Sequence, residues 1–141
     1  MADLSQQARF ETLADQLSAC ADALHRRLMA ALRKPVPAGS PPAIPQGVAQ
    51  ALFENEVALR QRANALYLDA AVVAASGLAV HQQALLELTA RAQQKIDKID
   101  RIKDLVDVAA ELLALGAALA GGKPDKVLSP LEKLKHHLDA L

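Results

Sequence analysis

Apolar residues recur at alternating intervals of three and four near the start of this sequence. That spacing places them on one face of an α-helix, whereas a β-strand would need a repeat of two. Asp3 and Gln6 stand in a weak capping-box arrangement, so we expect a helix over residues 3–34. The apolar positions that carry this prediction are Phe10, Leu13, Leu17, Cys20, Leu24, Leu28 and Ala31.

The composition favours helices throughout. Only 2% of the 141 residues are aromatic although 52% are hydrophobic, and most of the apolar residues are Ala and Leu. Ala and Leu have high helix propensity, while a sheet would need the β-branched and aromatic residues that are scarce here. We therefore predict one all-α domain over residues 1–141, and the alanine bias suggests a bacterial source.

A proline-rich connector follows the first helix at residues 35–45. Five of these eleven residues are prolines, which lack an amide donor and clash with a preceding helical turn. We expect an extended, stiff segment that joins two helices. Its use as a ligand for a proline-binding domain is a weak alternative.

The region from 46 to 120 contains no proline and has two interpretations. Ser76–Gly77 could end a helix if Gly77 adopts the left-handed conformation, with Leu78 packing back on Val73, which gives helices near 46–76 and 78–120. Alternatively, one long helix runs through, and a row of small residues allows close approach of a neighbouring helix. The helix-contact seam predicted from these rows is Leu59, Ala63, Leu66, Ala70, Val73, Gly77 and Ala84.

A short last helix is predicted from residue 130 to residue 140. Gly121–Gly122 ends the preceding helix, and Ser129, Pro130 and Glu132 resemble an N-cap, a first-turn proline and a capping-box partner. The expected fold is a bundle of about four long amphipathic helices with coiled-coil-like packing. Because the apolar faces are extensive, we expect at least a dimer.

The sequence offers no group of residues typical of catalysis, and we expect no catalytic, cofactor or metal site. Cys20 occupies a core position, and His25 and His81 have no recognisable partners. His136 and His137 are adjacent, so they point about 100° apart on a helix and read as surface residues. Carboxylates, Glu111 among them, look dispersed, and a Glu-x-x-His pair is absent.

The charge balance argues against a nucleic-acid partner, because sixteen basic and sixteen acidic residues cancel. One cysteine and an N-terminal region without a signal-like apolar run are typical of the cytoplasm. No small-molecule substrate is apparent, and no enzymatic activity is expected. We predict a helical interaction protein, acting as an adaptor, chaperone or immunity-type protein, that binds a partner protein or itself. The alternative is a membrane-acting helical protein whose apolar hairpin tip lies around residues 70–80.

Overall fold

The computed structural model describes residues 4–141, and over that range the chain forms helices and no strands. Asp3, the expected cap of the first helix, lies outside the described residues. The all-α class is confirmed, with more helices than expected. The elements are α1 (Leu4–Leu32), α2 (Gln46–Leu68), α3 (Ala70–Ala75), the 3₁₀ helix η1 (Leu78–His81), α4 (Gln82–Ile96), α5 (Ile102–Gly121) and α6 (Pro124–Ala140).

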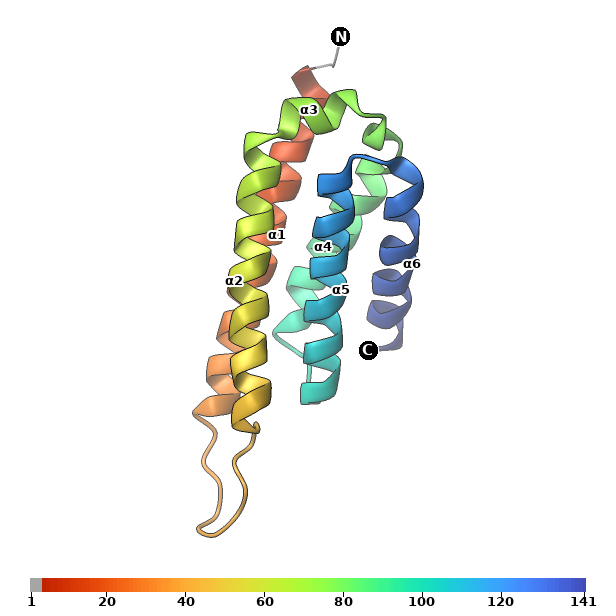
Figure 1. Ribbon diagram of the computed structural model, residues 1–141. Helices are drawn as coiled ribbons and strands as arrows, with labels where there is room; N and C mark the ends of the chain where they lie inside the picture. The colour runs from red at the N-terminus through yellow and green to blue at the C-terminus, as the bar shows by residue number, and fades with distance from the viewer. Residues whose placement is uncertain (1–3) are drawn as a thin grey trace.

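Five long helices form a closed ring. α1 packs against α2 and α4, α2 also packs against α5, and α6 contacts both α5 and α4. α4 and α5 are consecutive in the chain but barely touch, and α6 lies between them to complete the ring. Figure 1 shows α1 and α2 as a long antiparallel pair, with α3 lying across one end of the bundle.

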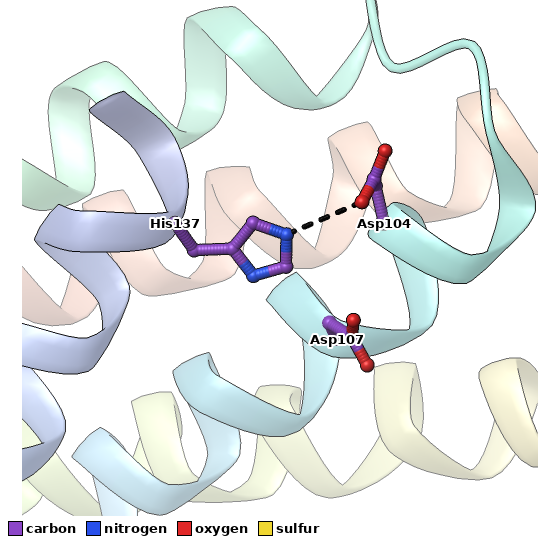
Figure 2. A group of neighbouring side chains, drawn as sticks. All are labelled: Asp104, Asp107 and His137. Carbon is purple, nitrogen blue, oxygen red and sulfur yellow. Dashed lines mark hydrogen bonds and ion pairs between the residues drawn. The ribbon is translucent and has the colours of Figure 1, made fainter. Parts of the chain in front are cut away.

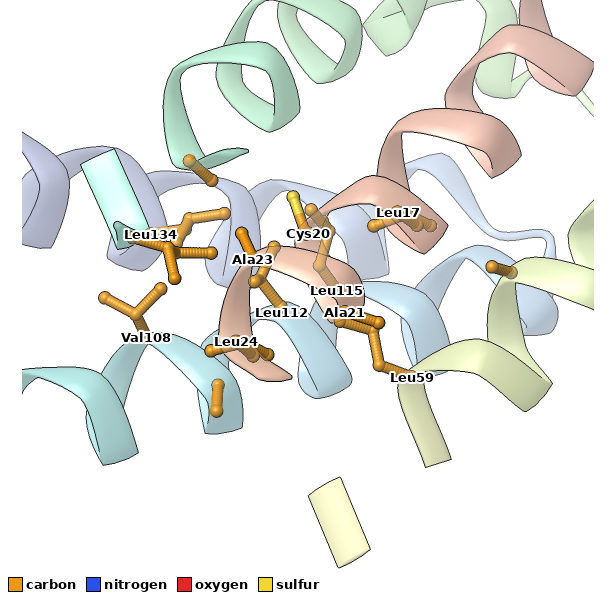
Figure 3. Close-up of a cluster of buried hydrophobic side chains, with 14 of the residues drawn as sticks. Leu17, Cys20, Ala21, Ala23, Leu24, Leu59, Val108, Leu112, Leu115 and Leu134 are labelled. Atoms are coloured by element: carbon orange, nitrogen blue, oxygen red, sulfur yellow. The ribbon is translucent and has the colours of Figure 1, made fainter. Parts of the chain in front are cut away.

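The core lies inside this ring, and α1 contributes the largest share of it. Its expected apolar face is confirmed, because all seven predicted positions from Phe10 to Ala31 are buried. Figure 3 shows the middle of the core, where α1 meets side chains from α2, α5 and α6. The residues labelled there are Leu17, Cys20, Ala21, Ala23, Leu24, Leu59, Val108, Leu112, Leu115 and Leu134.

The expected turn at Ser76–Gly77 is confirmed, and the alternative of one uninterrupted helix is wrong. Gly77 has φ of 95° and ψ of −3°, the left-handed conformation that glycine adopts without a steric penalty. The amide of Ser76 donates to the carbonyl of Val73, and Leu78 is completely buried after the turn. A milder irregularity at Asp69 separates α2 from α3 while the hydrogen bonds continue across it.

The predicted helix over 78–120 is wrong, because residues 97–101 form a turn between α4 and α5. This segment contains no glycine or proline, so tertiary contacts decide the break. Arg27 on α1 donates to the carbonyl oxygens of Ile99 and Asp100 at 2.6 and 3.2 Å, and the Ile99 side chain is buried. Those contacts satisfy carbonyl groups that a continuous helix would have paired internally.

The last helix begins at Pro124, and its predicted start at residue 130 is therefore wrong. Pro124 occupies the first turn, Asp125 supplies the acidic residue favoured there, and Pro130 lies inside the helix. Pro124 and Pro130 both fit the first turn of a helix, and the sequence pattern favours Pro130 because Ser129 and Glu132 flank it. Packing adds a turn and a half to the helix on the N-terminal side of Pro130, because Val127, one turn before the proline, is buried.

The connector between α1 and α2 extends beyond the end of the helix pair, as Figure 1 shows. The amide of Ser40 donates to the carbonyl of Pro37, and Gly39 has φ of 83° within that tight turn. Every residue from 35 to 43 is exposed, and Ile44 is the point where the chain returns to the core. The segment is non-helical, as its prolines predict.

Candidate functional site

Three carboxylates share one face of α5. Asp104, Asp107 and Glu111 occupy positions i, i+3 and i+7, which lie above one another on a helix. All three are half-buried, because α6 passes beside this face. The sequence interpretation treated Glu111 as one of several dispersed carboxylates and missed this group. The spacing along α5 was the available signal.

His137 of α6 lies beside Asp104 and Asp107 of this acidic face, as Figure 2 shows. Its Nδ1 is 3.1 Å from both carboxylate oxygens of Glu111, and its Nε2 is 3.4 Å from Asp104 Oδ1. The side chain is 16% exposed. The expectation of two surface histidines is therefore wrong for His137, whereas His136 is exposed. Adjacent helical residues point in different directions, so only one of them faces α5.

The charges in this group act strongly on one another. Burial opposes the charged form of His137, but Glu111, Asp104 and Asp107 together outweigh it and raise the pKa of the imidazole. Burial also acts against ionisation of Asp104. There, Arg101, whose Nε is 3.1 Å from Asp104 Oδ2, and His137 prevail and lower the pKa of that carboxyl. The group therefore favours a positive charge between the carboxylates.

Asp104, Asp107 and His137 could hold a metal ion. Each offers one ligand atom, and these atoms lie within 4.8 Å of one another. Within residues 4–141, Asp104 is bonded to Arg101 and His137, but no hydrogen bond or ion pair involves the Asp107 carboxylate. Asp107 acts on His137 through its charge. Three half-buried ligand atoms with one uncommitted carboxylate form the group that most resembles a binding site in the described chain.

A second surface stands out at the end of the bundle where α3 crosses. Leu68, Val72 and Val80 are 75%, 70% and 74% exposed, and Ala75 is exposed beside them in the chain. Residues 70–80 contain no charged side chain. Four residues of this segment are buried, namely Ala70, Val73, Ala74 and Leu78. We call Leu68, Val72, Ala75 and Val80 the apical surface.

The predicted helix-contact seam divides between the interior and the exterior. Five of its members lie in the core of the chain itself, while Gly77 and Ala84 are exposed. Gly77 belongs to the turn before η1, and Ala84 lines an open groove between α4 and α6. The five buried members are Leu59, Ala63, Leu66, Ala70 and Val73.

The fold gives hydrogen-bond partners to the other side chains that could take part in chemistry, Cys20, His25 and His81. Cys20 is completely buried, its thiol donates to the carbonyl of Thr89 at 3.4 Å, and burial raises its pKa to about 12. Such a thiol is a poor nucleophile near neutral pH. Two histidines do have partners, contrary to expectation. His25 Nδ1 is 3.0 Å from Glu56 Oε2, and His81 Nε2 is 3.0 Å from the carbonyl oxygen of Pro124. Both partners are distant in sequence, so only the fold brings them together.

Among residues 4–141, no helix has both the length and the apolar character needed to cross a bilayer. Comparisons of the chain with protein-family models, with curated proteins and with solved structures find no significant match.

Proposed function

We propose that this chain is a non-enzymatic interaction protein that associates with another protein chain through its apical surface. The observation that carries this proposal is the exposure of Leu68, Val72 and Val80 on a segment, residues 68–80, in which Asp69 is the one charged residue. Isolated exposed apolar residues are common on soluble proteins, whereas several at one end of a bundle are typical of a binding surface. A reducing compartment such as the cytoplasm suits the buried, unpaired thiol of Cys20.

Burial of the apolar helix faces narrows the predicted binding region from the whole helix-contact seam to one end of the bundle. Leu59, Ala63 and Leu66 are already buried within one chain, so they are not free to bind a partner. The apical surface is the part of the predicted apolar region that packing leaves uncovered. We therefore assign association to the bundle end and use a second copy of the chain as the first candidate partner.

Light scattering over a range of protein concentrations tests this assignment. We expect the wild type to be a dimer or larger. The double variant Leu68→Gln/Val72→Gln should have the solution mass of a monomer while keeping the helix content of the wild type. Val57→Gln is the matched control, because Val57 is 54% exposed on α2, away from the bundle end. A wild type that stays monomeric rules out self-association. A photo-crosslinker at position 72, compared with one at 57, then tests for a different protein partner in native cells.

Membrane action through residues 70–80 is the competing function, since exposed Leu68, Val72 and Val80 would also suit an interfacial contact. Flotation with vesicles of neutral and of anionic lipids separates the two proposals. A protein-binding surface leaves the chain in the unbound fraction with both lipids. Flotation that the double variant abolishes, together with a monomeric wild type, replaces our proposal with membrane binding.

A further inference from the structure

We propose that Asp104, Asp107 and His137 form a binding site for one divalent transition-metal ion between α5 and α6. The three ligand atoms come from two helices and already lie within 4.8 Å of one another (Figure 2). This site is separate from the apical surface and does not depend on the proposed association.

The ligand set matches the preferences of particular ions. One imidazole nitrogen with two carboxylate oxygens suits Zn²⁺ or Mn²⁺, whereas Mg²⁺ and Ca²⁺ prefer oxygen ligands alone. Asp104 and Asp107 are three residues apart on α5, the spacing at which two side chains on one helix can share an ion. His137 completes the set from the neighbouring helix, so a bound ion would join α5 to α6.

Glu111 orients the imidazole toward the site. Both of its carboxylate oxygens are 3.1 Å from Nδ1 of His137, so Nδ1 carries the hydrogen and donates it to Glu111. In the metal-free protein Nε2 lies 3.4 Å from Asp104 Oδ1 and donates to it when the imidazole is protonated, so an ion bound at Nε2 would take the place of that proton. A carboxylate that accepts from the second nitrogen of a metal-binding histidine is the usual arrangement around protein metal ions. Glu111 is accordingly a positioning residue.

The charges leave room for a cation. Asp104, Asp107 and Glu111 bring three carboxylates to one face, and the only Arg or Lys ion-paired with them in residues 4–141 is Arg101. Arg101 is 78% exposed, so its pair with Asp104 is a weak surface contact that an ion can displace. Asp107 has no such partner to lose.

The geometry requires a modest closing movement. Metal–ligand bonds of about 2.1 Å place ligand atoms roughly 3 to 4 Å apart, so the most distant of the three must move inward by about 1 Å. We expect rotation of the two aspartate side chains to supply this movement. The 15% exposure of Asp104 and 16% exposure of His137 give an ion access from solvent.

Isothermal titration of the full chain with ZnCl₂ and, separately, MnCl₂ tests the proposal. We expect one ion per chain, and a rise in melting temperature with metal, because the ion links two helices. Asp107→Asn is the decisive variant: it removes a ligand with no bond in the metal-free protein, so the fold is retained. We expect it to weaken binding by about 10-fold or more. Glu111→Gln should weaken binding at unchanged stoichiometry.

Two matched controls guard against binding to a surface histidine or to acidic residues in general. His136→Ala removes the exposed neighbour of His137, and Asp100→Asn removes an exposed carboxylate just before α5. Both should bind the metal as the wild type does. The proposal is wrong if neither metal binds up to millimolar concentration, if Asp107→Asn binds like the wild type, or if either control loses as much affinity.

Discussion

Gly77 determines the turn that separates α3 from η1. Its φ of 95° is in the region that side chains with a Cβ rarely adopt. The nearest atom to an added Cβ would be Pro124 Cγ at 3.5 Å, which is an ordinary contact. Any penalty for a side chain at this position therefore comes from the backbone, because there is space for a methyl group.

We predict that Gly77→Ala lowers the free energy of unfolding by about 1 to 2 kcal/mol, the cost of a left-handed alanine. Gly47→Ala is the matched control. Gly47 lies in the first turn of α2 with nothing within 4 Å of an added Cβ, and that variant should gain roughly 0.5 to 1 kcal/mol. Urea denaturation followed by circular dichroism measures both. Equal effects of the two substitutions would contradict the assignment of the turn to the conformation of Gly77.

Individual helices differ in how much of them the sequence could predict. α1 follows its apolar spacing closely because one wide face is buried along its whole length. The break between α4 and α5 has no local signal, since Arg27 reaches it from a distant part of the chain. The same limit applies to His137. Its partners lie more than twenty residues away on α5, and helix spacing within α6 cannot reveal them.

Pro130 is the irregular position of α6. It lies inside the helix, where a proline removes one backbone hydrogen bond and crowds the preceding turn. We predict that Pro130→Ala raises the free energy of unfolding by about 1 to 3 kcal/mol. The gain is reduced because alanine leaves the unfolded chain freer.

Pro124→Ala provides the comparison within the same helix. At the first turn the proline costs no hydrogen bond and its fixed φ suits the helix, so its replacement should leave stability unchanged or slightly lower. Thermal and urea unfolding of both variants measure the difference. A loss of stability in Pro130→Ala would mean that the proline ring packs usefully against its neighbours, and the argument from hydrogen bonding would then be wrong.

At the scale of the whole molecule, α6 connects parts that the rest of the chain leaves apart. It contacts α5 through His137, and it meets α4 where Arg91 pairs with Asp139 at 2.6 Å and Lys95 donates to the carbonyl of Leu138. Since α4 and α5 barely touch, these contacts and the buried leucines of α6 close the ring. The proposed metal site therefore lies where an ion would strengthen the closure of the whole bundle.

The connector lies outside that ring, so we expect its side chains to contribute little to the stability of the bundle. Residues 36–42 are exposed, so replacing them with a short Gly-Ser linker removes no packed side chain. Loop-closure entropy changes slowly with length, and we expect the free energy of unfolding to stay within about 1 kcal/mol of the wild type. Ile44→Ala should by contrast cost about 2 to 5 kcal/mol, because Ile44 is 2% exposed and its loss leaves a cavity. Urea unfolding of the two variants side by side tests the contrast. If the Gly-Ser linker lowers the free energy of unfolding as much as Ile44→Ala does, the connector prolines stabilise the fold, and the connector is then part of the folded structure together with the helices.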